Sequence, residues 1–316
     1  DCDWSSDVCS SDLTYLFYTL LSASQYLSQG REFIDAAICG YLPEETSYPE
    51  SIHKSMLYSV LAGGKRLRPV LVIAAAEAVG GNRKDVLPFA VAAEYIHTYT
   101  LIHDDLPALD NDDLRRGKPT NHKVFGEAIA ILAGDALLTQ AFYLMTHSGL
   151  MGSIPPEKLL QAAHDMTGAI GTSGMIGGQV VDIESEGKPI NAETLEYIHI
   201  HKTGRLIRAC IRAGAILSQA GVDQLDSLSS YGEQIGLAFQ IVDDILDITA
   251  DQGLLGKDIG SDAEKEKATF PALYGLDESK KKAEKLVEEG IACLEDFGEE
   301  AEPLRSIGRF FTQRAF

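Results

Sequence analysis

Apolar residues recur at spacings of three and four along most of this chain, which is the periodicity of helices that bury one face in a core. Alternating runs of β-branched residues, which would predict strands, are rare. Stretches rich in Gly, Pro, Asn, Asp or charge predict loops at residues 41–49, 80–84, 107–119, 149–156, 187–191, 220–222, 250–267 and 276–279. No stretch is long or biased enough to mark a domain boundary. We therefore expect residues 14–316 to form one all-α domain, a large bundle of about ten helices.

The first 13 residues differ from this body of the chain. Residues 3–13, DWSSDVCSSDL, can be encoded by a common sequencing-adapter string, so we expect residues 1–13 to be a disordered artefact; a genuine disordered leader is the alternative. This segment holds two of the five cysteines. The other three, Cys39, Cys210 and Cys293, form neither a CxxC motif nor a disulfide framework, which fits a reducing cytoplasm.

The net charge of −20 makes binding to nucleic acid improbable, because the phosphate backbone would be repelled. The longest uninterrupted apolar stretches are far shorter than the roughly 20 residues of a membrane span, so we expect none. Two basic clusters stand out against this acidic background, at residues 65–68 and 115–116.

A stripe of aspartates crosses an otherwise apolar segment at residues 231–248, YGEQIGLAFQIVDDILDI. Gln240, Asp243, Asp244 and Asp247 share one face of the predicted helix, at offsets 0, 3, 4 and 7. An ordinary solvated face would mix charges of both signs. Carboxylates alone among bulky apolar residues repel one another and must be desolvated, and a divalent cation relieves both costs. Oxygen ligands favour Mg²⁺, with Mn²⁺ as a substitute.

A second acidic cluster follows the segment PFAVAAEYIHTYTLIHDD, residues 88–105. Asp104 and Asp105 fall near one helical face with His97, and Pro107 is expected to end the helix. Asp110 could then approach them. The alternative is a solvated acidic loop capped by the arginines at 115 and 116, but carboxylates for a metal beside arginines for phosphate favour a diphosphate site.

The segment GGKRLRP, residues 63–69, offers flexible backbone and three cations, so it is either a phosphate site or an exposed basic turn. It does not match the P-loop pattern GxxxxGK[ST]. The Gly-rich stretch 167–179 is not a dinucleotide fingerprint, because no strand is predicted before it.

Taken together, these segments resemble the trans-isoprenyl diphosphate synthases, most closely the bacterial farnesyl diphosphate synthases. The resemblance runs from about residue 63 to 271 and rests on GGKRLRP (63–69), HTYTLIHDDLPALDNDDLRRGKPTNH (97–122), AGDALL (133–138), GGQVVDI (177–183), HKTGRLI (201–207), FQIVDDILD (239–247) and a lysine-bearing tail (256–271). It implies an isoprenoid-synthase bundle with a central cavity between two Asp-rich helix ends. It also implies a homodimer that joins dimethylallyl or geranyl diphosphate to isopentenyl diphosphate with Mg²⁺.

The resemblance also implies roles for individual residues. At the metal site, Asp104 and Asp110 would coordinate from one wall with Asp105 supporting them, and Asp243 would coordinate from the other wall with help from Asp244 and Asp247. The allylic diphosphate would be held by Arg115, Lys202, Lys257 and Lys267, and isopentenyl diphosphate by Lys65, Arg68, His97 and Arg116. Thr203 and Gln240, with Lys202, would line the place where the allylic cation forms.

Product length is expected to depend on Tyr99, followed by Thr100, because the residue five before the first Asp is the floor under the growing chain in similar enzymes. A bulky floor implies the C15 product farnesyl diphosphate. The alternatives are a C20 (geranylgeranyl) synthase, a non-catalytic synthase subunit and a class I terpene cyclase, and the two intact Asp clusters and the basic 63–69 segment weigh against the last two.

Overall fold

The computed structural model describes residues 22–249 and 269–313, and within these ranges the protein is almost entirely helical, as predicted. The α-helices are α2 (Ala23–Ile38), α3 (Glu50–Val60), α4 (Leu67–Ala78), α5 (Leu87–Asp104), α6 (Asn121–Phe125), α7 (Glu127–Thr146), α8 (Pro156–Ile170), α9 (Met175–Ser185), α10 (Ala192–His199), α11 (Arg205–Leu217), α12 (Val222–Thr249), α14 (Phe270–Tyr274), α15 (Leu276–Ala292) and α16 (Glu302–Gln313). Three short segments are 3₁₀ or π helices: η1 (Cys39–Tyr41), η2 (Ile200–Gly204) and η3 (Glu299–Ala301). A two-stranded antiparallel hairpin, β1 (Leu114–Arg115) with β2 (Lys118–Pro119), follows α5.

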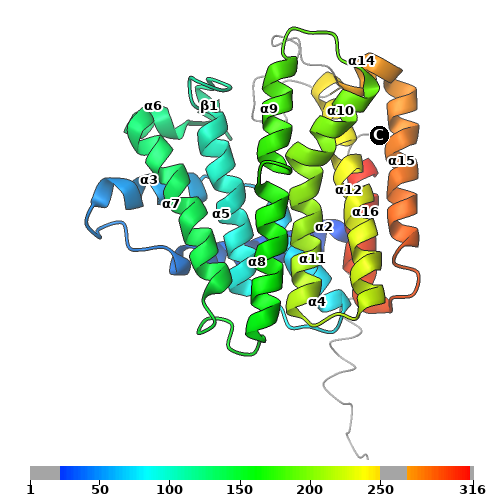
Figure 1. Ribbon diagram of the computed structural model, residues 1–316, viewed down its shortest axis with the longest axis horizontal. Coiled ribbons are helices and arrows are strands. Elements are labelled where there is room, and N and C mark those ends of the chain that lie inside the picture. Colours follow the sequence, from blue (N-terminus) through cyan, green and yellow to red (C-terminus); the bar gives the residue numbers. More distant parts are fainter. Residues whose placement is uncertain (1–21, 250–268, 314–316) are drawn as a thin grey trace, which may run out of the picture.

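The long helices stand side by side, and the C-terminal ends of α5 and α12 lie at the same end of the bundle, near β1 and α14 (Figure 1). Helix α5 packs on α7 and α4, α4 packs on α11, and α11 packs on α8 and α12. Because α5 and α12 carry the two Asp clusters at their C-terminal ends, this arrangement brings both clusters to one end of the bundle.

The centre of the bundle is built by two helices that are buried along most of their length. In α4 the run from Pro69 to Ala76 is buried throughout, and in α11 nearly every residue from Leu206 to Leu217 is buried. Because α4 packs on α5 and α11 packs on α12, these two buried helices set the positions of the helices that carry the Asp clusters.

Two details differ from the sequence prediction. Residues 276–279 belong to the first turn of α15. The break falls at Gly275, whose φ of 81° is favourable only for a residue without a side chain. The described residues also contain more helices than the ten or so expected, since short helices such as α6 and α14 are set off by one such glycine each, Gly126 and Gly275.

Helix α7 is more apolar than the sequence analysis had suggested. Among the described residues it alone has the length and composition to cross a membrane, and 39% of its most apolar window is buried. A single helix of this kind is weak evidence for a span. The same helix packs tightly against α5, while Ile131, Leu132 and Tyr143 are exposed.

Candidate active site

The first acidic wall forms where α5 ends. Asp104 is the last residue of the helix, and the backbone N–H of Asp110 returns to donate to the carbonyl of Asp104 at 2.7 Å. This turn brings Asp110 beside Asp104, as predicted. Burial raises the pKa of Asp104 to about 6; the charge of Lys202 opposes this shift, and the charge of Asp110 adds to it. The wall therefore presents carboxylates that are costly to leave ionised without a cation.

Asp105 has a different environment from its neighbour. It is 3% exposed, and its Oδ1 accepts from Nε of Arg115 at 2.6 Å and lies 2.5 Å from Nη2 of the same arginine. The same Nη2 lies 3.4 Å from Asp112. Asp105 therefore holds the arginine of strand β1 against the end of α5, and its predicted supporting part at the metal site stays a prediction.

The second acidic wall lies near the end of α12. Asp243 is partly buried, Asp244 is 5% exposed and Asp247 is exposed. Oδ2 of Asp244 lies 2.8 Å from Nε2 of His199 and accepts from the backbone N–H of Phe270 at 2.9 Å. Asp244 therefore joins α12 to α10 and to the start of α14, and its predicted part in metal binding stays a prediction.

The π-helix η2 carries Lys202 and Thr203 between these walls. Nζ of Lys202 donates to Asp182 of α9 at 2.7 Å, and the hydroxyl of Thr203 donates to Oε1 of Gln240 at 2.8 Å. The structure thus brings together the three residues predicted to lie around the allylic carbon. A π-helix is uncommon in proteins and occurs often at functional sites.

Glycines let the backbones around η2 approach closely. A Cβ added to Gly178 of α9 would lie 2.4 Å from the backbone N of Lys202, and one added to Gly236 of α12 would lie 2.8 Å from Cα of Gly204. Real side chains do not tolerate such distances. The two glycines therefore place η2 directly against α9 and α12.

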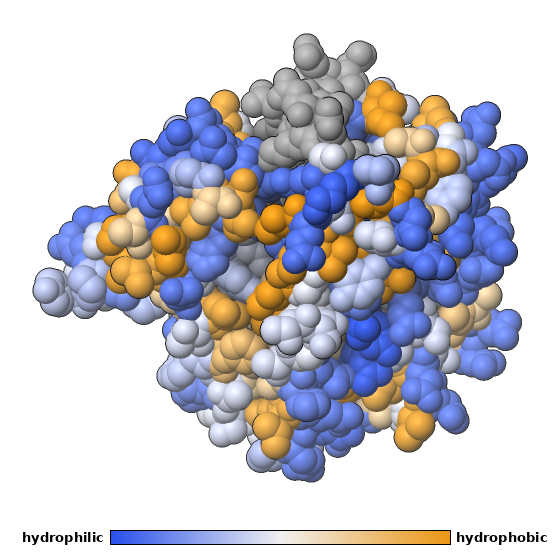
Figure 2. Space-filling model, turned by 45° about the horizontal axis from the view of Figure 1, so that its top comes forward, coloured by the Kyte–Doolittle hydropathy of each residue, from blue (hydrophilic) through white to orange (hydrophobic). Residues whose placement is uncertain are grey.

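A cavity of about 110 Å³ opens between α9, α10 and α12. Its polar lining includes Asp182, Lys202, Gln240 and Asp244, and its apolar lining includes Ile190, Leu195 and Ile198. On the face of the molecule that carries this end of the bundle, a band of apolar residues runs between hydrophilic ones (Figure 2). Charged groups beside apolar walls suit a substrate with an ionic head and a hydrocarbon tail.

The predicted cationic site forms around the start of α4. Burial lowers the pKa of His97 well below its usual value, and the charges of Arg68, Arg116 and Arg115 add to this effect. These side chains therefore lie near one another, and His97 is neutral. Nε of Arg68 is buried and has no hydrogen-bond partner, while Lys65 is exposed. Such a cluster is suited to an anion with several oxygens.

The two sites are close to each other. The charge of Lys202 acts on Asp104, and the charge of Asp243 acts on Arg68. Groups from α4, α5, η2 and α12 therefore meet at one end of the bundle.

Tyr99 lies one turn below the first wall. Its ring is 6% exposed and makes an edge contact with His103, with 5.8 Å between the ring centroids. Its hydroxyl is buried without a hydrogen-bond partner, and burial together with the charge of Asp104 raises the pKa of Tyr99 to about 12. The neighbouring Thr100 donates to the carbonyl of His97 at 2.7 Å.

Some predicted features cannot be placed. Lys257, Lys267 and the segment 1–13 lie outside the described residues. Within 22–249 and 269–313, no three His, Cys, Asp or Glu side chains converge on a ready-made cation site, and the predicted Mg²⁺ stays a prediction.

Four residues with defined contacts in or beside this site were given no role by the sequence analysis: Arg66, Glu94, Asp182 and His199. Asp182 and His199 hold Lys202 and Asp244, and Glu94 is buried among arginines. The available signal was an acidic residue, Glu94, inside an apolar helix, where burial of its charge requires a partner.

Comparison with known proteins agrees with this geometry. The sequence model described as polyprenyl synthetase matches residues 49–303. The farnesyl diphosphate synthase of Bacillus subtilis is 47% identical over 84% of this chain and 89% of its own, and the geranylgeranyl diphosphate synthase of Cyanophora paradoxa is 45% identical over 92% and 95%. The apo crystal structure of an FPP/GFPP synthase from Zymomonas mobilis superposes with a TM-score of 0.81 at 38% identity, covering 92% of this chain and 98% of that one. The chain therefore belongs to the polyprenyl synthetase family, with the all-α isoprenoid-synthase fold and the prenyltransferase activity of trans-prenyl diphosphate synthases.

Proposed function

We propose that the protein condenses dimethylallyl or geranyl diphosphate with isopentenyl diphosphate, head to tail, and releases farnesyl diphosphate and diphosphate. One observation carries this proposal: the acidic walls lie beside a separate cationic cluster, since Asp105 contacts Arg115 and the adjacent Arg116 donates to the carbonyl of Gly63. A reaction between two diphosphate substrates needs two anion sites of this kind. An enzyme that cyclises one diphosphate needs only one.

The acidic walls fit Mg²⁺. Asp104, Asp110 and Asp243 offer the hard oxygen ligands that it prefers, and the raised pKa of Asp104 indicates a carboxylate whose burial the nearby cations do not offset. We propose that these three residues hold the metal, with Asp247 at the rim and Asp105 and Asp244 bracing the walls; Mn²⁺ would substitute. When bound, Mg²⁺ would supply the charge that makes diphosphate a better leaving group.

The residues around η2 suit the chemistry at the allylic carbon. Lys202 and Arg115, each held by a carboxylate, can donate to the leaving diphosphate as the C–O bond breaks. Lys257 and Lys267 are proposed to join them. Thr203 and Gln240 offer neutral oxygen dipoles to the allylic cation without capturing it. The double bond of isopentenyl diphosphate then attacks, and a proton passes to the departed diphosphate.

The cationic cluster suits isopentenyl diphosphate. Arg68, Arg116 and Lys65 can neutralise its diphosphate, and the unpartnered Nε of Arg68 is a donor that such a ligand would satisfy. A neutral His97 can donate one further hydrogen bond.

The C15 product rests on Tyr99. Its buried ring lies one turn below Asp104, where it would stop a growing chain. A geranylgeranyl product is the second candidate, because a geranylgeranyl diphosphate synthase is among the similar relatives at nearly the same identity.

We also propose a homodimer in the cytoplasm. The exposed apolar side chains of α7 support an interface with a second copy, since a helix this apolar is otherwise costly to leave in water. The three cysteines of the described residues are free, which fits a reducing compartment.

The experiment is a product assay. Purified protein is incubated with Mg²⁺, isopentenyl diphosphate and either dimethylallyl or geranyl diphosphate, and products are sized by mass spectrometry with an EDTA control. An EDTA-sensitive C15 diphosphate is expected. A C20 diphosphate would refute the role of Tyr99, and turnover of farnesyl diphosphate alone to a hydrocarbon would refute the condensation.

A further inference from the structure

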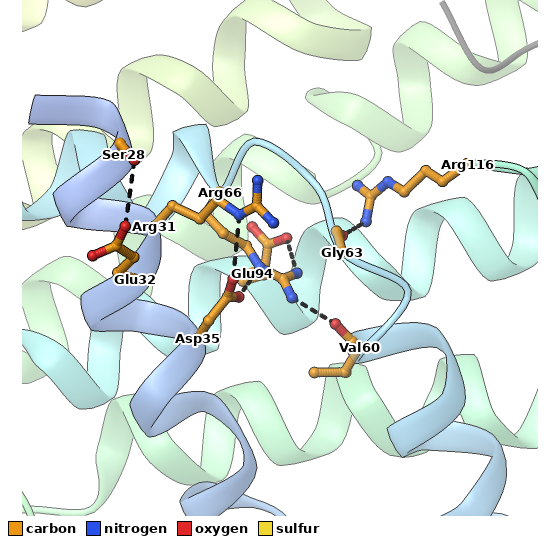
Figure 3. Close-up of polar contacts among 9 residues, drawn as sticks. All are labelled: Ser28, Arg31, Glu32, Asp35, Val60, Gly63, Arg66, Glu94 and Arg116. Carbon is orange, nitrogen blue, oxygen red and sulfur yellow. Dashed lines mark hydrogen bonds and ion pairs between the residues drawn. The ribbon is translucent and has the colours of Figure 1, made fainter. Parts of the chain in front are cut away.

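Arg66 stands in the GGKRLRP segment between Lys65 and Arg68, yet its side chain turns into the protein. It extends toward Asp35 of α2 and Glu94 of α5, on the other side of the segment from Arg116 (Figure 3). The guanidinium side chain is 1% exposed. Arg66 is therefore out of reach of a diphosphate that binds to its two neighbours in the sequence.

Each nitrogen of the Arg66 guanidinium has a partner on a different element. Nε donates to Oδ1 of Asp35 at 2.8 Å, Nη1 to Oε1 of Glu94 at 2.7 Å and Nη2 to the carbonyl of Val60 at 2.7 Å. These contacts connect α2, α5 and the end of α3. A planar fork can make all three at once, whereas the single ammonium of lysine cannot reproduce that geometry.

This arrangement carries two local costs. Arg66 has a left-handed backbone, with φ 50° and ψ 33°, which is unfavourable for a residue with a Cβ. The Arg66–Glu94 pair is buried on both sides, and a buried ion pair is often no more stable than apolar packing of the same size. Costs of this kind are retained where a backbone has to be held in one conformation.

Glu94 also faces the cations of the proposed isopentenyl diphosphate site. Its negative charge raises the pKa of Arg66, Arg68 and Arg116, against the effect of burial in each case. Its Oε2 is buried without a hydrogen-bond partner. Glu94 is thus the anion around which these arginines gather before a substrate binds.

The other side of the segment is held as well. Arg116 donates to the carbonyl of Gly63, and a Cβ on Gly64 would overlap the Arg116 guanidinium. The segment is therefore fixed at Gly63 by one arginine and at Arg66 by another, with Lys65 between them.

We propose that Arg66, Glu94 and Asp35 are positioning residues for isopentenyl diphosphate: they hold residues 63–68 so that Lys65 and Arg68 meet the diphosphate, and they do not touch it. This inference rests on the proposed function of the cationic cluster. It predicts a defect confined to one of the two substrates.

The test compares Arg66→Lys and Glu94→Gln with the unmodified protein. Binding of isopentenyl diphosphate alone is measured by calorimetry, and KM is measured for isopentenyl and geranyl diphosphate. Both variants should bind isopentenyl diphosphate about tenfold more weakly, because small displacements of binding groups are costly, while KM for geranyl diphosphate changes less than about twofold. The control is Arg212→Lys, since Arg212 also connects three helices through Asp165 and Ser229 but lies outside the site. It should leave both KM values unchanged.

Unchanged affinity for isopentenyl diphosphate in both variants, or equal losses for both substrates, would overturn the inference. If the unmodified protein does not bind isopentenyl diphosphate, the proposed function fails first and this inference with it. Should Arg66→Lys not fold, Asp35→Asn makes the same comparison, because the Asp35 side chain is 36% exposed and its replacement keeps the shape.

Discussion

Asp104 is expected to lower the stability of the metal-free protein and to be required for prenyl transfer. Replacing it with Asn should stabilise the metal-free protein at neutral pH and abolish prenyl transfer. The reason is that burial raises the pKa of Asp104 to about 6 although the charges of Lys202 and Arg115 oppose this shift; the charges of Asp110 and Asp105 add to it. An ionised Asp104 therefore destabilises the folded protein unless a cation is bound beside it.

The size of this destabilisation follows from the shift in the pKa of Asp104. A pKa raised from 3.8 to about 6 corresponds to about 3 kcal/mol between the two protonation states. The folded protein binds the proton more tightly than the unfolded chain does. Stability from this group is thus complete below about pH 4 and is lost as the pH rises through about 6. Asn cannot ionise, so Asp104→Asn should gain about 3 kcal/mol at pH 7.5 but only about 1 kcal/mol at pH 4.5.

Urea unfolding followed by circular dichroism, in EDTA at both pH values, measures the free energy of unfolding. Asp135→Asn is the control, because the Asp135 side chain is 61% exposed, and its effect should stay within about 0.5 kcal/mol. An Asp104→Asn variant no more stable than the parent at pH 7.5, or equally stabilised at both pH values, would refute the reasoning.

The remaining predictions concern the chain-length floor at Tyr99, the contacts of Asp244 and the proposed dimer interface on α7. Tyr99→Ala should extend the product beyond C15 by mass spectrometry, whereas Tyr99→Phe should keep C15 and gain up to about 1–3 kcal/mol in urea unfolding, since it removes a buried hydroxyl without a partner; a C15 product from the Ala variant would contradict this. Asp244→Ala removes the shared acceptor of His199 and Phe270 and should cost at least about 1–3 kcal/mol by calorimetry, and an unchanged Tm would show that the brace carries no stability. Leu132→Asp, at a side chain 54% exposed, should convert a dimer to a monomer in sedimentation velocity, and an unaltered dimer would remove α7 from the interface.

The helical architecture and the two Asp clusters could be predicted because both depend on local spacing. A period near 3.6 places Gln240 and Asp244 on one face of α12 whatever else surrounds them, and Pro107 marks the end of α5 by its own stereochemistry.

The partners of adjacent aspartates could not be read from the sequence. Neighbours on a helix point about 100° apart, so the two carboxylates of each pair meet different surroundings. Those surroundings depend on the tertiary structure: Asp244 contacts His199, 45 residues earlier in the chain. The same holds for Arg66, which the sequence shows only as one cation among three. The short helices were missed because single glycines with positive φ, such as Gly126, divide what otherwise reads as continuous helix.

The glycine contacts around η2 have a consequence for how this active site can be altered. Because Gly178 and Gly236 bring backbone against backbone, any larger residue there would displace the backbone of η2, at Lys202 or at Gly204. Substitutions at these two glycines would therefore disrupt this part of the site rather than change its shape by small steps. The predicted floor is instead a side chain, Tyr99, whose size can change in small steps while the backbone of α5 stays in place. On the proposed function, product length can therefore be changed gradually through Tyr99 of α5, whereas the backbone around η2, where the allylic substrate is proposed to react, cannot be changed in small steps.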